Sequence, residues 1–278
     1  MNDTVKLGDL TVRRLGFGGM RLCGAGVMGP PADPAAALAV LRHAVDAGVQ
    51  LIDTADAYGP DINEEQIAAA LYPYPPDLVI ATKGGSTRPD GQWAREGRPA
   101  HLKAACEGSL RRLRLERIDV YQLHSPDSKV PFAESIGALK ELRDAGKIRH
   151  VGLSNVSVAQ LDEARRIVPI VSVQNRYNVG ARQSDDVVDA CERDGLAFLP
   201  YFPIEAGSLA KARGPLAAIA ERRHATTAQI ALAWLLKRAP VIAPIPGTSS
   251  RAHLDENLGA AAIDLTQAEF ADLSRAAA

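Results

Sequence analysis

The feature that most constrains the fold of this chain is a repeated alternation of short β-branched segments with longer segments rich in Ala, Leu, Glu and Arg. The strand-like segments cover 14–18, 49–53, 78–83, 118–124, 150–154, 170–174, 197–201 and 241–246. Several of them are apolar or small at successive positions, as in parallel strands that are covered on both faces. Eight strand–helix repeats in 278 residues predict an α/β fold, a single (β/α)8 TIM barrel over residues 1–278, with a doubly wound open sheet as the alternative.

Two segments fall outside these repeats. Residues 5–12, interrupted by Gly8-Asp9, predict a short N-terminal β-hairpin, and the segment from Thr266 predicts an appended C-terminal helix. Helix starts are marked by residues that satisfy the free N–H groups of a first turn. These are Asp33 before Pro34, and the capping-box pairs Ser157/Gln160, Thr226/Gln229 and Thr266/Glu269.

Composition narrows the possible partners. The 32 Lys and Arg residues nearly balance the 33 Asp and Glu residues, so the positive field that a nucleic-acid binder needs is absent, and no apolar stretch is long enough to span a membrane. The three cysteines lie far apart without a CxxC pair, and no HExxH motif occurs. We therefore expect a cytoplasmic protein without a metal site that acts on a small molecule; its oligomeric state stays open, and a monomer is compatible with the sequence.

One motif points to a function that its context does not support. Residues 24–29 have the GxGxxG spacing of dinucleotide-binding loops, but that fingerprint must open directly into a helix. Here Pro30-Pro31 follows at once, and the next helix is expected to begin at Pro34. The glycines are therefore predicted to lie in a loop after the first strand.

A stronger signal lies at the ends of three successive strands. Asp53 ends the second strand and Tyr58 follows it, Lys83 ends the third and His124 ends the fourth. In a barrel these strand ends meet at one mouth, where catalytic residues gather. Taken singly, three of these residues have a structural alternative: a helix cap for Asp53, a solvated strand end for Lys83 and a buried imidazole for His124.

Together the four side chains fit acid catalysis. A neighbouring ammonium favours the phenolate, so Lys83 is expected to lower the pKa of Tyr58, and Asp53 is expected to keep Lys83 charged. Tyr58 would then give a proton to a carbonyl oxygen, while His124 orients or polarises that oxygen.

The sequence resembles the aldo-keto reductases along essentially the whole chain. The segment from Gln50 to Gly59 is similar to the family's Asp-to-Tyr signature, 80–83 to its lysine strand and 121–124 to its histidine strand. Gly152-Leu-Ser-Asn155, Gln174-Asn175, Tyr201 and Pro246-Gly-Thr248 continue the resemblance in order. The loop 84–98 and the turn 122–127 look most like the branch that contains bacterial pyridoxal reductases.

The resemblance implies NADPH, bound across the barrel mouth without a Rossmann domain. Ser154, Asn155 and Gln174 would then bind the carboxamide, Tyr201 would stack on the nicotinamide, and the loops after strands seven and eight would hold phosphates. The remaining cofactor contacts implied by the family are Gly19, Met20, Asp53, Phe202, Pro203, Gly207, Ser208, Leu209, Pro246, Gly247, Thr248, Ser249, Ser250, Arg251, Glu256 and Asn257.

One departure from the family leaves the choice between NADPH and NADH open. Many relatives carry one or two basic residues just after Pro-Gly-Thr, whereas this chain has Ser249 and Ser250 there, and Arg251 is the first cation. Hydroxyl groups and one Arg can still bind a phosphate.

The predicted function is NADPH-dependent reduction of an aldehyde or ketone, with pyridoxal as a named candidate. Substrate contacts are expected from Arg21, Trp93 and His124; Trp93 either walls an aromatic substrate or packs on its own loop. Two alternatives stay open: a nucleotide-binding regulatory module with little turnover, and an NAD(P)-dependent alcohol or sugar dehydrogenase that works mainly by oxidation.

Overall fold

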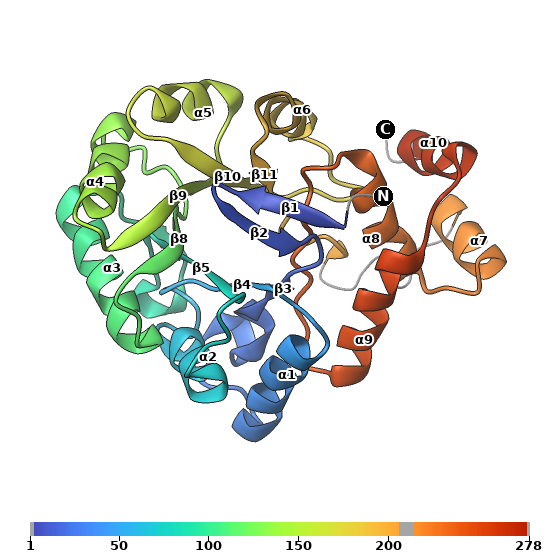
Figure 1. The fold of residues 1–278 in the computed structure, drawn as a ribbon, viewed down its shortest axis with the longest axis horizontal. Coiled ribbons are helices and arrows are strands. Elements are labelled where there is room, and N and C mark those ends of the chain that lie inside the picture. Colours follow the sequence, from blue (N-terminus) through green and yellow to red (C-terminus); the bar gives the residue numbers. More distant parts are fainter. Residues whose placement is uncertain (1–2, 206–213, 277–278) are drawn as a thin grey trace.

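The computed structural model describes residues 3–205 and 214–276. Its main sheet has seven parallel strands in the order β11-β10-β9-β8-β5-β4-β3. Figure 1 looks down this curled sheet, with the helices arranged in a ring outside it. The strands are β3 (Phe17–Gly18), β4 (Leu51–Asp53), β5 (Val79–Gly84), β8 (Ile118–Leu123), β9 (Ile148–Ser154), β10 (Ile170–Gln174) and β11 (Ala197–Phe198).

The eighth expected strand, 241–246, closes the ring without forming a regular ladder. On one side it exchanges backbone hydrogen bonds of 2.9 and 2.8 Å with β11, and on the other Gly16 and Gly18 donate to Pro244 and Pro246 at 3.0 and 3.2 Å. The two prolines have no N–H, so this edge cannot return bonds toward β3. The predicted barrel is confirmed, and the open-sheet alternative is wrong.

The helices begin where the capping residues predict. Asp33 accepts a hydrogen bond from the Ala36 N–H, and the capping boxes at Ser157 and Thr226 both form. Thr266 and Glu269 exchange the same pair of bonds before the appended C-terminal helix. The helices are α1 (Pro34–Asp46), α2 (Ile62–Leu71), α3 (Pro99–Leu113), α4 (Phe132–Asp144), α5 (Val158–Arg165), α6 (Asp185–Asp194), α7 (Pro215–Arg222), α8 (Thr227–Arg238), α9 (Arg251–Gly259) and α10 (Gln267–Ala276).

The predicted N-terminal hairpin forms from β1 (Thr4–Leu7) and β2 (Leu10–Arg13). In Figure 1 it lies across the centre of the ring. Its apolar side chains share a buried cluster with residues that begin barrel strands: Val5, Leu7 and Val12 with Leu51, Val79 and Ala197. The hairpin thus covers the amino end of the barrel, which leaves the carboxyl end for a ligand.

Two loops at the carboxyl end have more structure than periodicity predicts. Loop 84–98 contains β6 (Ser86–Thr87) paired antiparallel with β7 (Ala94–Arg95), around the 3-10 turn η3 (Pro89–Gly91). The GxGxxG segment contains a 3-10 turn, η2 (Ala25–Val27), and opens no helix before α1. The prediction that these glycines lie in a loop after the first strand is confirmed.

None of the helices within the described ranges is long and apolar enough to cross a membrane.

Candidate active site

Lys83 lies at the centre of the four residues that the sequence singled out. Its ammonium donates to Asp53 Oδ2 at 2.7 Å, to the Thr54 carbonyl at 2.8 Å and to the Tyr58 hydroxyl at 3.3 Å. These three bonds use every proton that an ammonium can donate. The predicted contact between the phenol and the amine is therefore present, and their side chains are almost fully buried.

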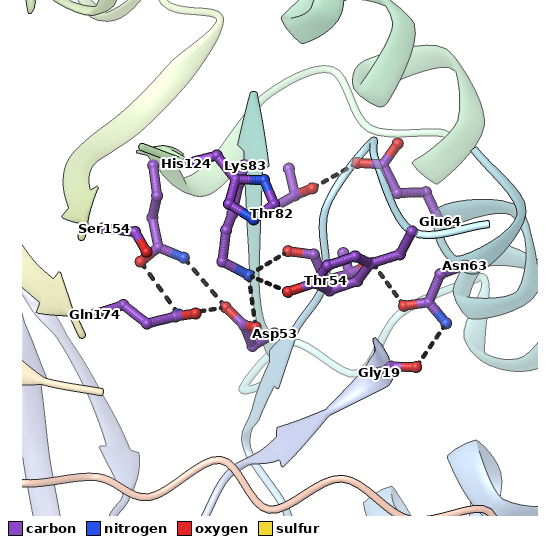
Figure 2. A network of polar contacts seen from close by, with 12 residues as sticks. Gly19, Asp53, Thr54, Asn63, Glu64, Thr82, Lys83, His124, Ser154 and Gln174 are labelled. Carbon is purple, nitrogen blue, oxygen red and sulfur yellow. Dashed lines mark hydrogen bonds and ion pairs between the residues drawn. The ribbon is translucent and has the colours of Figure 1, made fainter. Parts of the chain in front are cut away.

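Asp53 is held from its other side by two amides. Its Oδ1 accepts hydrogen bonds from Gln122 Nε2 at 3.1 Å and from Gln174 Nε2 at 2.7 Å (Figure 2). The alternative that Asp53 merely caps the next helix is wrong, because Asp61 occupies the N-cap position of α2. The carboxylate is instead fixed as the partner of Lys83.

The barrel and a tight turn explain why these groups meet. Asp53 ends β4, Lys83 lies in β5 and His124 follows β8, and these three strands are neighbours in the sheet. Tyr58 is placed by a turn, in which its N–H donates to the Ala55 carbonyl at 3.1 Å.

Burial and charge act against each other at this site. Burial lowers the pKa of Lys83, but the Asp53 carboxylate and the bonds that Lys83 donates outweigh it, so the pKa lies above its ordinary value. For Tyr58, burial raises the pKa and Lys83 lowers it, and the effect of burial is the larger. The expectation of an acidified phenol needs this correction: Lys83 acts in the predicted direction, yet the pKa of Tyr58 stays above its usual value because the hydroxyl is buried.

The His124 imidazole is a neutral group beside the phenol. Burial and the Lys83 charge hold the pKa of His124 well below its ordinary value. Its ring packs edge-on against Tyr58 at 5.9 Å between centroids. Its buried Nδ1 has no hydrogen-bond partner among the residues that the structure describes.

A polar network behind the site links these strand ends to helix α2 (Figure 2). Asn63 accepts a hydrogen bond from the Thr54 hydroxyl at 2.7 Å and donates to the Gly19 carbonyl at 3.0 Å. Thr82, next to Lys83, donates to Glu64 at 2.5 Å. The bonds of Thr54 and Thr82 restrain residues that border Asp53 and Lys83 in sequence, and the bond to Gly19 ties Asn63 to the segment after β3.

A cavity of about 1190 Å³ lies beside the four side chains; Lys83 is not part of its lining but donates to Asp53 and Tyr58, which are. Asp53, Tyr58 and His124 line it, together with most of the residues expected to contact a cofactor or substrate. Those expected residues are Met20, Arg21, Trp93, Ser154, Asn155, Gln174, Tyr201, Phe202, Pro203, Gly247, Thr248, Ser249, Glu256 and Asn257.

Some expected contacts are not part of that lining. Among the described residues, Gly19, Pro246, Ser250 and Arg251 do not line the cavity, and the Ser250 hydroxyl instead caps α9. Gly207, Ser208 and Leu209 lie outside the described residues.

Other lining residues escaped the sequence analysis. His253 lines the cavity, as Ser249 does, and stands two residues beyond the Arg251 that was expected there. On α9 the spacing to Glu256 is three residues, so helical geometry puts both on one face and could have indicated His253. Val27 and Ile204 carry no sequence signal that distinguishes them.

One hydrogen-bonded chain joins three of the expected cofactor residues. The Asn155 amide donates to the Ser154 hydroxyl and to the His124 carbonyl, both at 3.0 Å, and its oxygen accepts from the Tyr201 hydroxyl at 2.8 Å. The left-handed backbone of Asn155, at φ = 60°, directs its side chain into these bonds. The chain thus places a hydroxyl, an amide and an aromatic ring along one wall.

No group of three or more His, Cys, Asp or Glu residues in the described ranges is arranged to hold a metal ion.

Comparisons with known proteins agree with this geometry. The sequence model of the aldo/keto reductase family matches residues 14–278. A pyridoxine 4-dehydrogenase of Escherichia coli is 43% identical over 274 residues, which cover 96% of this chain and 95% of that protein. An uncharacterized oxidoreductase of Schizosaccharomyces pombe is 44% identical over 271 residues, which cover 97% and 88%.

Solved structures extend the agreement to the fold. An aldo/keto reductase of Klebsiella pneumoniae, in complex with NADP and acetate, superposes with a TM-score of 0.83 at 27% identity, covering 99% of this chain and 95% of that one. The barrel, the buried Asp–Lys–Tyr cluster and these matches lead to one conclusion: the chain belongs to the aldo/keto reductase family.

Proposed function

We propose that this protein reduces an aldehyde or ketone to an alcohol with NADPH, and that Tyr58 donates the proton. The observation that carries the proposal is that Tyr58 and a neutral His124 line one cavity, while the Lys83 ammonium donates to the Tyr58 hydroxyl from behind. A phenol and an imidazole that line one cavity can both bond a carbonyl oxygen.

The cavity residues fit a nicotinamide dinucleotide. Ser154 and Asn155 offer a hydroxyl and an amide for a carboxamide, and Tyr201 offers a flat ring. Thr248 and Ser249 offer hydroxyls for phosphate, and His253 lines the same cavity. The NADP-bound Klebsiella relative supports the same cofactor here. When bound, NADPH supplies the hydride for the carbonyl carbon.

The protein's part in the reaction is to hold and move a proton. The raised pKa keeps the Tyr58 phenol protonated at neutral pH. The oxygen of a reduced carbonyl becomes an alkoxide, which is far more basic than any phenolate, so proton transfer from Tyr58 is downhill. Lys83, fixed by Asp53, then stabilises the phenolate that remains.

The substrate side of the cavity favours a flat carbonyl compound. The Trp93 ring packs edge-on against Tyr58 and His124, at 6.3 and 5.8 Å between centroids. A planar substrate could lie against these rings. Pyridoxal is such a compound, and the name of the E. coli relative, pyridoxine 4-dehydrogenase, supports it as the first to test.

A panel experiment tests the proposal. NADPH and NADH are titrated by fluorescence, and their oxidation is followed with pyridoxal, an unsubstituted aromatic aldehyde and a small aliphatic aldehyde. Turnover of an aromatic aldehyde with NADPH supports the proposal. Tight cofactor binding without turnover of any carbonyl would favour a regulatory module instead.

A second candidate is oxidation of an alcohol by the same residues. The dehydrogenase name of the E. coli relative favours it. In the oxidative direction, Tyr58 would accept the proton of the alcohol as a phenolate. The oxidation rate should therefore rise at alkaline pH. The discriminating measurement is the ratio of pyridoxine oxidation to pyridoxal reduction across pH.

A further inference from the structure

Arg88 joins two loops at the mouth of the barrel and is itself only 8% exposed. Its Nη1 donates to the Val27 carbonyl at 3.1 Å, and its Nη2 donates to the carbonyls of Gly26 at 2.8 Å and Gly91 at 2.7 Å. The first two carbonyls belong to the loop after β3, and the third belongs to the loop that carries Arg88. One guanidinium therefore fixes both loops relative to each other.

The same guanidinium lies over the indole of Trp93. The distance from Arg88 Cζ to the ring centroid is 4.1 Å, well within the range of a cation–π contact. Trp93 is 49% exposed and lines the cavity. The indole therefore contacts Arg88 as well as the rings of Tyr58 and His124.

Within the described ranges no carboxylate pairs with Arg88 in an ion pair, so its charge is compensated by carbonyl dipoles and the indole face. A buried cation without a counter-ion is costly, and only a planar guanidinium can both fork to several carbonyls and stack on a ring. Lysine in its place would lose the fork and the stacking.

Arg88 also holds a strained residue. Val27 lines the cavity with φ = 62°, a left-handed conformation that β-branched residues rarely adopt. Its carbonyl accepts from Arg88 and, at 3.2 Å, from the N–H of Gly59, the residue after Tyr58. Such strain persists only where surrounding bonds impose it.

We propose that Arg88 is a specificity-determining positioning residue: it holds Trp93 and Val27 in place as the substrate-side wall and so makes the site selective for flat aromatic carbonyl compounds over small aliphatic ones. The inference rests on the proposed carbonyl reduction for its kinetic consequence. The wall itself is independent of that function, because its contacts need no substrate.

The test uses Arg88→Met and Arg88→Lys, with Arg98→Met as the matched control. Arg98 lies in the same loop, but its side chain is 70% exposed and pairs with Glu96. We expect both Arg88 variants to raise KM for the aromatic aldehyde about tenfold with a smaller change in kcat, and so to lower the aromatic-to-aliphatic ratio of kcat/KM about tenfold. Arg98→Met should leave that ratio within about twofold.

Two further measurements separate this role from a general loss of structure. Trp93 and the fully buried Trp234 are the only tryptophans, so acrylamide quenching should increase in the Arg88 variants through Trp93 alone. In a Trp93→Leu background, Arg88→Met should shift the ratio much less than in the natural protein, because coupled residues are not additive.

Three results would overturn the inference: unchanged quenching, a ratio that moves less than about twofold, or full additivity with Trp93→Leu. If the natural protein reduces no carbonyl compound, the proposed function fails, while the quenching measurement still decides whether Arg88 holds Trp93.

Discussion

The Lys83 ammonium lies 2.7 Å from the Asp53 carboxylate, at a point where the two side chains are 1% and 3% exposed. A buried ion pair is favourable only when further hydrogen bonds satisfy both groups. Here Lys83 also donates to the Thr54 carbonyl and the Tyr58 hydroxyl. Asp53 also accepts hydrogen bonds from the amides of Gln122 and Gln174. The pair is therefore fully satisfied, and neither partner can be removed without leaving the other charge or its bonds uncompensated.

Asp53→Asn should destabilise the protein by about 3–5 kcal/mol, because it leaves the Lys83 charge buried without its partner. Urea unfolding at pH 7 measures the change. Asp255→Asn is the matched control, since Asp255 is 58% exposed in its pair with His43 and should cost less than about 1 kcal/mol. Equal losses in the two variants would show that the buried pair has no special role.

Tyr58→Phe should lower the reduction rate by about 10² to 10⁴, the contribution of a positioned proton donor. Cofactor affinity, measured by NADPH fluorescence, should change little because the hydroxyl accepts a hydrogen bond from Lys83 and, in the proposed reaction, contacts the substrate and not the cofactor. Tyr72→Phe serves as the control, since Tyr72 is 51% exposed and does not line the cavity. A Tyr58→Phe enzyme that keeps most of its rate would remove Tyr58 from the proposed role.

The reduction rate should be flat through neutral pH and fall only in alkali. The pKa of Tyr58 is raised from 10.0, so the donor stays protonated until the pH passes that raised value. The lowered pKa of His124 leaves the imidazole neutral and predicts no break near its ordinary 6.5. A pH profile of kcat measures this, and a break near neutrality would show that another group titrates in the rate-limiting step.

The free energy of unfolding should also fall in alkali. Both Tyr58 and Lys83 have raised pKa values in the fold. Their stabilising contribution is therefore complete below the ordinary values of 10.0 and 10.5 and is lost as the pH rises through the folded-state values. Urea unfolding between pH 7 and 11 should show a steeper alkaline loss for the natural protein than for Tyr58→Phe.

Arg14→Met should cost at least about 3 kcal/mol, because it orphans buried carbonyl groups. The Arg14 guanidinium is 4% exposed and donates to Ile242, Leu236 and Ala239 at 2.6 to 2.8 Å. Burial lowers its pKa to about 10, so it stays charged at neutral pH. Arg193→Met, at a side chain 63% exposed, should stay within about 0.5 kcal/mol.

The positions of Asp53, Lys83 and His124 could be predicted because parallel strands bring their carboxyl ends to one edge, whatever the details of packing. The hairpin and the helix starts were also predictable, since turn and cap residues act locally. The sign of the Tyr58 pKa shift was not, because it depends on how much water the folded site excludes.

Other features depend on contacts that leave no periodic trace. The strands β6 and β7 have two residues each, too few for an alternating pattern. The support that Arg88 gives to Trp93 comes from stacking across a turn, and the absence of a regular strand at 241–246 follows from Pro244 and Pro246.

The bonds that close the ring connect the first barrel segment with the last. Gly16 and Gly18 reach Pro244 and Pro246, and Arg14 reaches Ile242, 228 residues away in sequence. During synthesis on a ribosome, most of the sheet can therefore form while the edge at β3 still lacks its partner segment, 241–246. Contacts so distant in sequence form slowly, and an edge left open during synthesis is prone to pair with other chains. Milder substitutions of Arg14 should accordingly reduce the yield of soluble protein in a cell even where they lower the stability of the folded protein only slightly.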